Sequence, residues 1–240
     1  MIRLFLAFTS LLPLKTNHSF GSFIGYLLYL FNSEAKSVSK QNLEICFPGL
    51  SELELKSLLK KVLTETGKGL TESGLIWNQN FTDNAKLIRN INGEHYFDSS
   101  KKTILLVPHM GCWEITGRVL AEKRKVTFMY RPLRSNKQND YLFSRRNQGN
   151  LTMASADKLG ILKIQRALNN GDLVGMLPDQ DPGKEGGLMS PFFGKKVNTM
   201  TLLARIAKKQ NAQVLMFWAE RLDDGQGYDL NIEPVDLNAN

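Results

Sequence analysis

The stretch Thr103-Ile104-Leu105-Leu106-Val107-Pro108-His109-Met110-Gly111-Cys112-Trp113-Glu114 decides the fold. It opens with a short apolar run that is typical of a buried strand, and a helical pattern near residues 113–123 follows it. A buried strand that leads directly into a helix is the repeating unit of α/β proteins. The stretch therefore predicts an α/β domain, with His109 on the turn between strand and helix.

The same alternation continues toward the C-terminus. Strands are expected at 103–108, 125–130, 173–177, 213–218 and 228–232, and helices near 113–123, 137–147, 158–169 and 199–210. This pattern predicts a mixed central sheet flanked by helices. Upstream, Ser51 and Glu54 form a capping-box pattern that opens a helix over residues 51–79, and the glycines at 67, 69 and 74 are expected to interrupt it.

The N-terminus holds two apolar runs, residues 2–14 and 20–31. Neither reaches the roughly 18 to 20 residues that cross a bilayer alone. We expect residues 1–31 to form a membrane-attachment segment, which spans once, forms a re-entrant hairpin or lies in the interface. A cleaved signal peptide and buried core helices are the alternatives. Residues 32–240 are expected to form the catalytic domain.

Charge and cysteine content restrict the partners and the compartment. The net charge is +8, and residues 115–170 hold twelve Lys or Arg against three acidic residues. That region should attract an anionic partner. Nucleic acid is disfavoured, because no helix-turn-helix or aromatic RNA-binding pattern accompanies the charge. Cys46 and Cys112 lack the spacing of a zinc site or a disulfide framework, which favours a reducing compartment.

His109 and Glu114 are the candidate catalytic pair. Residues five apart on one helix face different directions, so the two side chains should meet only if His109 lies on the turn and Glu114 in the first helical turn. A carboxylate that holds one imidazole nitrogen lets the other take a proton from an attacking hydroxyl. The alternatives are a covalent mechanism on Cys112 and a histidine that merely packs at a strand end.

Two further features are expected at the same edge of the sheet. Arg131 follows a strand and could bind an anionic substrate or stabilise an oxyanion, the alternative being a solvated surface arginine. Asp179 and Asp181 lie in a loop bounded by proline and glycine after the strand at 173–177, with Asp179 the stronger candidate. Two aspartates without a third ligand of suitable spacing predict no metal site.

Four ordered elements together resemble the lipid A biosynthesis lauroyl/myristoyl acyltransferases of Gram-negative bacteria, whose fold is similar to that of glycerolipid acyltransferases. The elements are His109-x4-Glu114, Tyr130-Arg131-Pro132, Pro178-Asp179-Gln180-Asp181-Pro182-Gly183 and Pro191-Phe192-Phe193-Gly194. The resemblance implies acyl transfer from an acyl carrier protein thioester to a hydroxyl of a 3-hydroxyacyl chain on a lipid A precursor, without a cofactor. It makes His109 the general base, Glu114 its orienting partner, and Arg131, Arg146 and Asp179 substrate-binding residues, with Arg145 as the alternative to Arg146.

The resemblance also implies partners and a place in the cell. The partners are acyl carrier protein, the lipid A precursor and membrane lipids, and the place is the cytoplasmic side of the bacterial inner membrane. Similar chains continue into a C-terminal section that this chain is expected to lack. The Phe192-Phe193 pair is expected either to shape an acyl-chain cleft or to be ordinary core. The alternative functions are a glycerolipid or phosphatidylinositol-mannoside acyltransferase and a non-catalytic basic membrane-binding protein.

Overall fold

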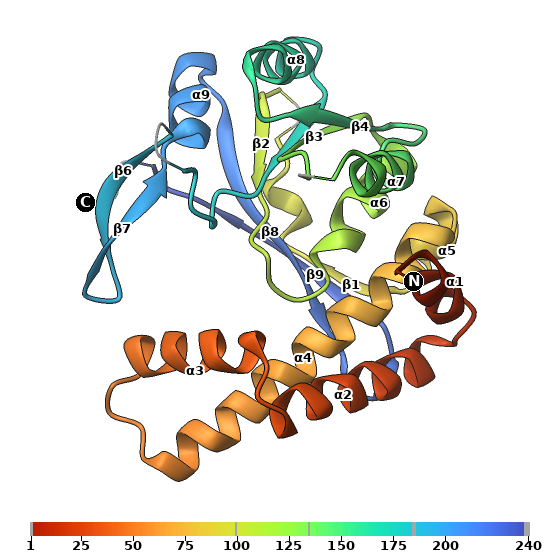
Figure 1. Cartoon of the computed structure of the whole chain (residues 1–240). Coiled ribbons are helices and arrows are strands. Elements are labelled where there is room, and N and C mark those ends of the chain that lie inside the picture. The colour runs from red at the N-terminus through yellow and green to blue at the C-terminus, as the bar shows by residue number, and fades with distance from the viewer. Residues whose placement is uncertain (1, 99, 134, 184–185, 238–240) are drawn as a thin grey trace. The chain divides into compact units, whose positions relative to one another are not determined.

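The computed structural model describes residues 2–98, 100–133, 135–183 and 186–237 (Figure 1). The chain divides into two compact units. The first comprises Met1–Gln79, Phe193–Lys195 and Leu222–Gly227, and the second comprises Asn80–Phe192, Lys196–Arg221 and Tyr228–Asn240.

The first unit is helical. Its elements are α1 (Ile2–Ser10), α2 (Leu14–Leu30), α3 (Glu34–Cys46), α4 (Glu52–Asn78) and the short 3-10 helix η2 (Asp223–Gly225). The two apolar runs thus form separate helices, and Pro13 caps the start of the second. None of the helices in the described part of the chain combines the length and the apolarity needed to cross a membrane.

Helix α4 begins with the predicted capping box, since the Ser51 and Glu54 side chains each accept a hydrogen bond from the other residue's backbone N–H. The predicted interruption of this helix is wrong, because α4 runs unbroken to Asn78. Two of its three glycines serve close packing instead. A Cβ on Gly67 would lie 2.0 Å from the backbone oxygen of Gly21 in α2, so only glycine lets the two backbones touch there.

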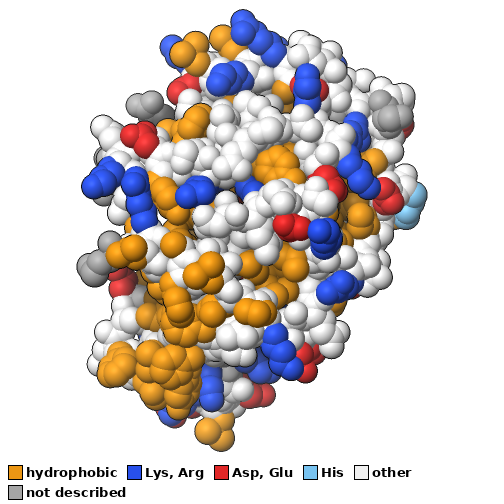
Figure 2. All heavy atoms as spheres, turned by 90° about the vertical axis from the view of Figure 1, so that its right-hand side faces the viewer, with side chains coloured by type: hydrophobic (Ala, Val, Ile, Leu, Met, Phe, Trp, Pro, Cys, Tyr) orange, Lys and Arg blue, Asp and Glu red, His pale blue; other side chains and the backbone are white. Residues whose placement is uncertain are grey.

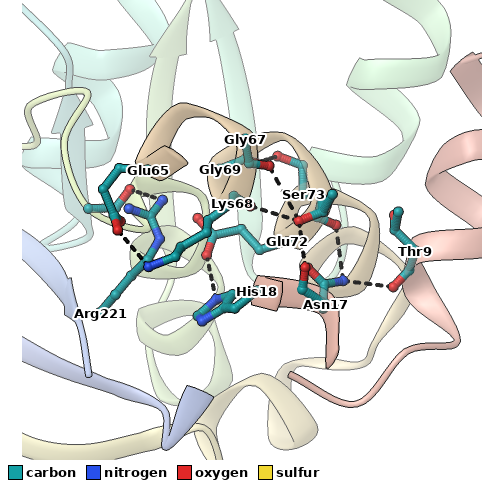
Figure 3. Close-up of polar contacts among 12 residues, drawn as sticks. Thr9, Asn17, His18, Glu65, Gly67, Lys68, Gly69, Glu72, Ser73 and Arg221 are labelled. Atoms are coloured by element: carbon teal, nitrogen blue, oxygen red, sulfur yellow. Dashed lines mark hydrogen bonds and ion pairs between the residues drawn. The ribbon is translucent and has the colours of Figure 1, made fainter. Parts of the chain in front are cut away.

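Buried polar groups also join these helices (Figure 3). The Asn17 amide donates to the backbone oxygen of Thr9 at 2.8 Å and to that of Thr71 at 3.2 Å. His18 Nε2 lies 3.2 Å from a carboxylate oxygen of Glu72, and both side chains are buried. Such contacts fix the register of α1 and α2 against α4, since a buried polar group that loses its partner is costly.

The second unit is built on a seven-stranded sheet in the order β1-β9-β8-β2-β5-β3-β4. Each neighbouring pair is parallel except β8 with β9. A separate two-stranded sheet pairs β6 with β7. The strands are β1 (Ile88–Asn92), β2 (Thr103–Leu106), β3 (Val126–Tyr130), β4 (Leu151–Ser155), β5 (Leu173–Met176), β6 (Gly187–Phe192), β7 (Lys195–Met200), β8 (Gln213–Arg221) and β9 (Tyr228–Pro234).

Helices cover both faces of the seven-stranded sheet. They are α5 (Phe81–Ala85), α6 (Trp113–Lys123), α7 (Asn136–Arg146), α8 (Lys158–Asn169) and α9 (Leu202–Gln210), with the 3-10 helix η1 (Glu94–Tyr96). One face packs on α8 and α9 through a core that includes Ile104, Val174, Ile164 and Ile206. On the other face, Phe128 fills the space above Gly175 and touches α6 at Gly117.

The α/β class and the mixed, helix-flanked sheet are therefore confirmed. All five predicted strands and all the predicted helices are present, with small differences at their ends. The sequence prediction missed β1, β4, β6 and β7. The parallel order of β2, β5 and β3 sets the site, because it brings the carboxyl ends of three strands to one edge of the sheet.

Candidate active site

His109 lies on the turn that connects β2 to α6, as predicted. The backbone N–H of Cys112 donates to the backbone oxygen of Ala219 at 2.9 Å, and Arg221 donates to the backbone oxygen of Gly111 at 2.7 Å. Gly111 has a left-handed φ of 58°, and a Cβ there would lie 1.9 Å from the oxygen of Ala219. Strand β8 thus fixes the turn, and glycine is required in it.

The strand register brings His109 together with Asp179. Leu106 of β2 stands opposite Met176 of β5, and each candidate residue follows three positions later. The backbone N–H of His109 donates to Asp179 Oδ2 at 2.7 Å, and His109 Nδ1 lies 2.8 Å from Asp179 Oδ1. One carboxylate therefore holds both the backbone and the ring of the histidine.

These contacts select one tautomer of the imidazole. A carboxylate can only accept, so the ring nitrogen that faces Asp179, Nδ1, must carry a proton. In neutral His109 the lone pair then lies on Nε2. The side-chain nitrogen of Gln180 lies 3.4 Å from His109 Nε2. The Gln180 amide N–H can thus donate to Nε2, which accepts in this tautomer. The His109 side chain is 28% exposed, so it is partly open to an approaching substrate.

The contacts with His109 also keep Asp179 ionised. Partial burial acts to raise the pKa of this carboxyl group, but the hydrogen bonds from the His109 ring and backbone outweigh burial and hold the pKa below its ordinary value. The carboxylate is therefore negative at neutral pH. An imidazole with such a partner can act as a general base.

Glu114 lies in the first turn of α6, as predicted, but its carboxylate meets Arg146 of α7. Arg146 Nε donates to Glu114 Oε2 at 3.1 Å, and Arg146 Nη2 donates to Glu114 Oε1. The Arg146 guanidinium also lies over the Trp113 ring, 5.0 Å from its centre. The Trp113 and His109 rings pack edge to face, with 4.9 Å between their centres and 63° between their planes. The structure thus pairs His109 with Asp179 and Glu114 with Arg146. The predicted dyad of His109 and Glu114 stays a prediction.

Arg131 and Asp181 occupy the same edge of the sheet. Asp181 accepts from the backbone N–H of Gly183 at 2.9 Å and from the Asn198 amide at 2.9 Å, and these bonds lower the pKa of its carboxyl group. Its role is thus to shape the loop after β5. Arg131 is exposed, and a Cβ on Gly183 would lie 3.4 Å from its Nη2. The predicted substrate-binding roles of Arg131, Arg146 and Asp179 stay predictions.

Arg118 is a residue that the sequence reasoning missed. Its side chain is almost fully buried, donates to the Asn84 side chain at 2.5 Å and to the backbone oxygen of Arg145 at 3.1 Å, and lies over the Phe81 ring. Burial lowers the pKa of Arg118 to about 10. Nothing in the local pattern distinguishes it from the other basic residues of 115–170. That stretch is therefore not a uniformly solvated basic face, because Arg118 and Arg146 bind partners inside the fold.

The remaining candidates of the sequence also have definite places. Cys112 is 1% exposed, and a buried thiol is a poor nucleophile, which disfavours the covalent alternative. Phe192 and Phe193 are 60% and 53% exposed, so this pair is not ordinary core. Among the described residues, no group of three or more His, Cys, Asp or Glu side chains is placed to hold a metal ion.

Comparison with known proteins gives the family. Residues 2–237 match the family described as bacterial lipid A biosynthesis acyltransferase. The chain is 29% identical to a lipid A biosynthesis lauroyltransferase of Escherichia coli, over 95% of this chain and 75% of that protein. It is 27% identical to a lipid A biosynthesis palmitoleoyltransferase of Escherichia coli, over 89% and 71% of the two chains.

A third relative is a lipid A biosynthesis acyltransferase of Haemophilus influenzae, 26% identical over 92% of this chain and 71% of that protein. The family match spans both units, including the turn that carries His109 and the loop that carries Asp179. The chain therefore belongs to the bacterial lipid A biosynthesis acyltransferase family and is an acyltransferase.

Proposed function

We propose that this acyltransferase moves a fatty acyl group from an acyl carrier protein thioester to a hydroxyl of a 3-hydroxyacyl chain on a lipid A precursor. Two of its relatives are a lauroyltransferase and a palmitoleoyltransferase of lipid A biosynthesis, which supports the acceptor and the reaction type. The observation that carries the proposal is the contact of 2.8 Å between His109 Nδ1 and Asp179 Oδ1, which places the proton on Nδ1 and the lone pair on Nε2.

The reaction follows from that arrangement. His109 Nε2 removes the proton of the acceptor hydroxyl while its oxygen attacks the thioester carbonyl carbon. The tetrahedral oxyanion collapses, the carbon–sulfur bond breaks, and the imidazolium returns the proton to the departing thiolate. The negative charge of Asp179 stabilises the imidazolium during these steps. Arg131, which is exposed beside the loop after β5, is a suitable cation for the oxyanion or for an anionic part of a substrate.

We also propose that the chain works at the cytoplasmic surface of the bacterial inner membrane. Hydrophobic side chains gather on part of the surface in Figure 2. Residues 2–31 contain several exposed hydrophobic side chains. They include Ile2, Leu4, Phe8, Leu11, Phe23, Leu30 and Phe31. Helices with such faces suit the interface between headgroups and acyl chains, which does not require a spanning helix.

The test is acyl transfer by the purified full chain, followed by mass spectrometry of the acceptor. With an acyl carrier protein thioester and a lipid A precursor that has free 3-hydroxyacyl chains, the acceptor should gain one acyl group. The His109→Ala variant should lose about 10²–10⁴-fold in rate, the usual contribution of a general base, while staying folded. Transfer to lysophospholipid or glycerol phosphate but not to the lipid A precursor would contradict the proposed substrate, and an unchanged rate in His109→Ala would contradict the proposed base.

A further inference from the structure

The first unit contains a cleft between α3 and the first turns of α4. Its volume is about 580 Å³, within the range of pockets that hold small ligands. The residues that line it come from α2, α3, α4 and the connection between α3 and α4: Tyr29, Lys36, Lys40, Glu44, Phe47, Pro48, Leu50, Glu52, Leu55, Lys56 and Leu59. None of them belongs to the candidate active site, which lies in the second unit.

The floor of the cleft is apolar and continuous with a core. Leu59 is 3% exposed and packs with Leu43 and Leu63, and the partly buried Leu55 and Tyr29 pack against this cluster. Phe47, at the end of α3, is 47% exposed. Apolar surface that stays open to solvent in this way gains free energy when an alkyl chain covers it.

The rim of the cleft carries an excess of positive charge. Lys40 pairs with Glu44 at 3.6 Å, and Lys56 pairs with Glu52 at 2.7 Å. Lys36 Nζ lies 5.2 Å from the centre of the Tyr29 ring, and no carboxylate among the described residues forms an ion pair with it. Three lysines against two glutamates leave one positive charge. The cleft thus joins an apolar floor to one ammonium group that can take an anionic partner.

We infer that this cleft binds a long-chain fatty acid, with the carboxylate at Lys36 and the alkyl chain along Leu55 and Phe47. A single carboxylate matches the single uncompensated ammonium group, and a charge-assisted hydrogen bond between them is stronger than a neutral one. A neutral chain would leave Lys36 without an anion. A polyanionic head group would meet Glu44 and Glu52. The site goes beyond the proposed acyl transfer and takes no part in its chemistry.

Calorimetric titration of the full chain with myristate, below the concentration at which myristate forms micelles, tests the inference. We expect saturable binding of one myristate, and weaker binding of the corresponding fatty alcohol. Lys36→Met should weaken myristate binding about two- to fivefold, the range for one partly exposed charge contact. Lys60→Met is the matched control, because Lys60 also lies over a tyrosine ring, that of Tyr26 at 4.9 Å, but does not line the cleft.

A photoreactive fatty acid locates the binding site, and it should label residues 34–59. Leu55→Trp, which fills the apolar part of the cleft, should abolish this labelling, and it keeps the test decisive if Lys36→Met does not fold. The inference is overturned if myristate shows no saturable binding, if Lys36→Met and Lys60→Met behave alike, or if labelling is confined to the second unit. These experiments measure binding and not catalysis. Failure to bind myristate therefore leaves the proposed acyl transfer unaffected, and failure of acyl transfer leaves the inferred fatty-acid site unaffected.

Discussion

Asp179 offers both of its carboxylate oxygens to one residue, His109. The bond to the backbone N–H fixes where the turn lies, and the bond to Nδ1 fixes how the ring is turned and which nitrogen accepts a proton. One side chain thus sets both position and tautomer. Glu114 has a comparable arrangement with a different residue, because its two oxygens accept from Nε and Nη2 of Arg146. A side-on pair of this kind restricts the guanidinium more than a single contact does.

The low pKa of Asp179 makes part of the stability depend on pH. Its folded-state pKa lies below the ordinary value of 3.8, because hydrogen bonds from His109 outweigh the opposing effect of burial. The stabilisation is therefore fully present above about pH 4 and is lost as pH falls through the lower, folded-state pKa. Denaturant unfolding of the wild-type chain and of Asp179→Asn at several pH values measures it. The difference in free energy of unfolding should shrink as pH falls below 4, and a difference that grows there would contradict the assignment.

Local patterns could identify the site residues but not all of their contacts. His109, Glu114 and Asp179 each follow a strand or open a helix, and the positions on turn, first helical turn and loop were predicted correctly. The contact between His109 and Asp179 depends on β2 and β5 being neighbours, and the two residues are 70 positions apart. The order of strands in a sheet is not encoded in the period of any one segment. The buried Arg118 escaped prediction for the same reason, since its partners come from other elements.

At the scale of elements, the turn between β2 and α6 depends on β8. Two contacts from β8 hold it, one to the backbone N–H of Cys112 and one to the backbone oxygen of Gly111. Strands β2 and β8 are parallel neighbours, with Leu106 opposite Met216. Strand β2, which leads into the turn, is paired with β5 on one side and with β8 on the other. These two pairings resist small displacements of the turn.

Gly111→Ala tests this dependence. The new Cβ would meet the backbone oxygen of Ala219 at 1.9 Å, so the turn must shift. A shift of about 1 Å at a catalytic group can lower the rate about 100-fold. Gly171→Ala is the matched control, because Gly171 has a similar left-handed φ of 78°, but no atom of the described residues lies within 4 Å of the added Cβ. It should lose about 1–2 kcal/mol of stability from backbone strain alone and keep its rate of acyl transfer. Equal rates in the two variants would show that the turn does not need this contact.

Elements with strong patterns were predictable, and those at edges were not. The strand patterns of β2 and β5 are continuous apolar runs, and both strands are buried at the centre of the sheet. By contrast, β1 is a largely exposed edge strand, Ile88-Arg89-Asn90-Ile91-Asn92, with few apolar residues to signal it. The glycines of α4 were misinterpreted as breaks, because the close approach of α2 that requires Gly67 is a property of two helices and not of one sequence segment.

At the scale of the whole molecule, the chain combines a helical unit and an α/β unit, each with its own core. The fold class followed from the alternation of strands and helices in residues 103–232, which lies almost wholly within the second unit. The N-terminal runs were harder to interpret, since apolar residues can face a core, a membrane or a ligand. In the structure some of them pack, as Leu6 and Leu14 do, and others such as Leu4 and Leu11 are exposed. The apolar sequence pattern alone does not distinguish the packed residues from the exposed ones.

The central claim is that His109 acts as a general base oriented by Asp179. The most direct measurement is the rate of acyl transfer, by mass spectrometry of the acceptor, in Asp179→Asn and Glu114→Gln. Asparagine can donate to Nδ1 and so stabilise the wrong tautomer, and Asp179→Asn should therefore lose about 10²–10⁴-fold in rate. Glu114→Gln should lose less rate but more stability, about 1–3 kcal/mol, because Arg146 loses a charged partner. Wild-type activity in Asp179→Asn together with an inactive, folded Glu114→Gln would contradict the claim and favour Glu114 as the partner of His109.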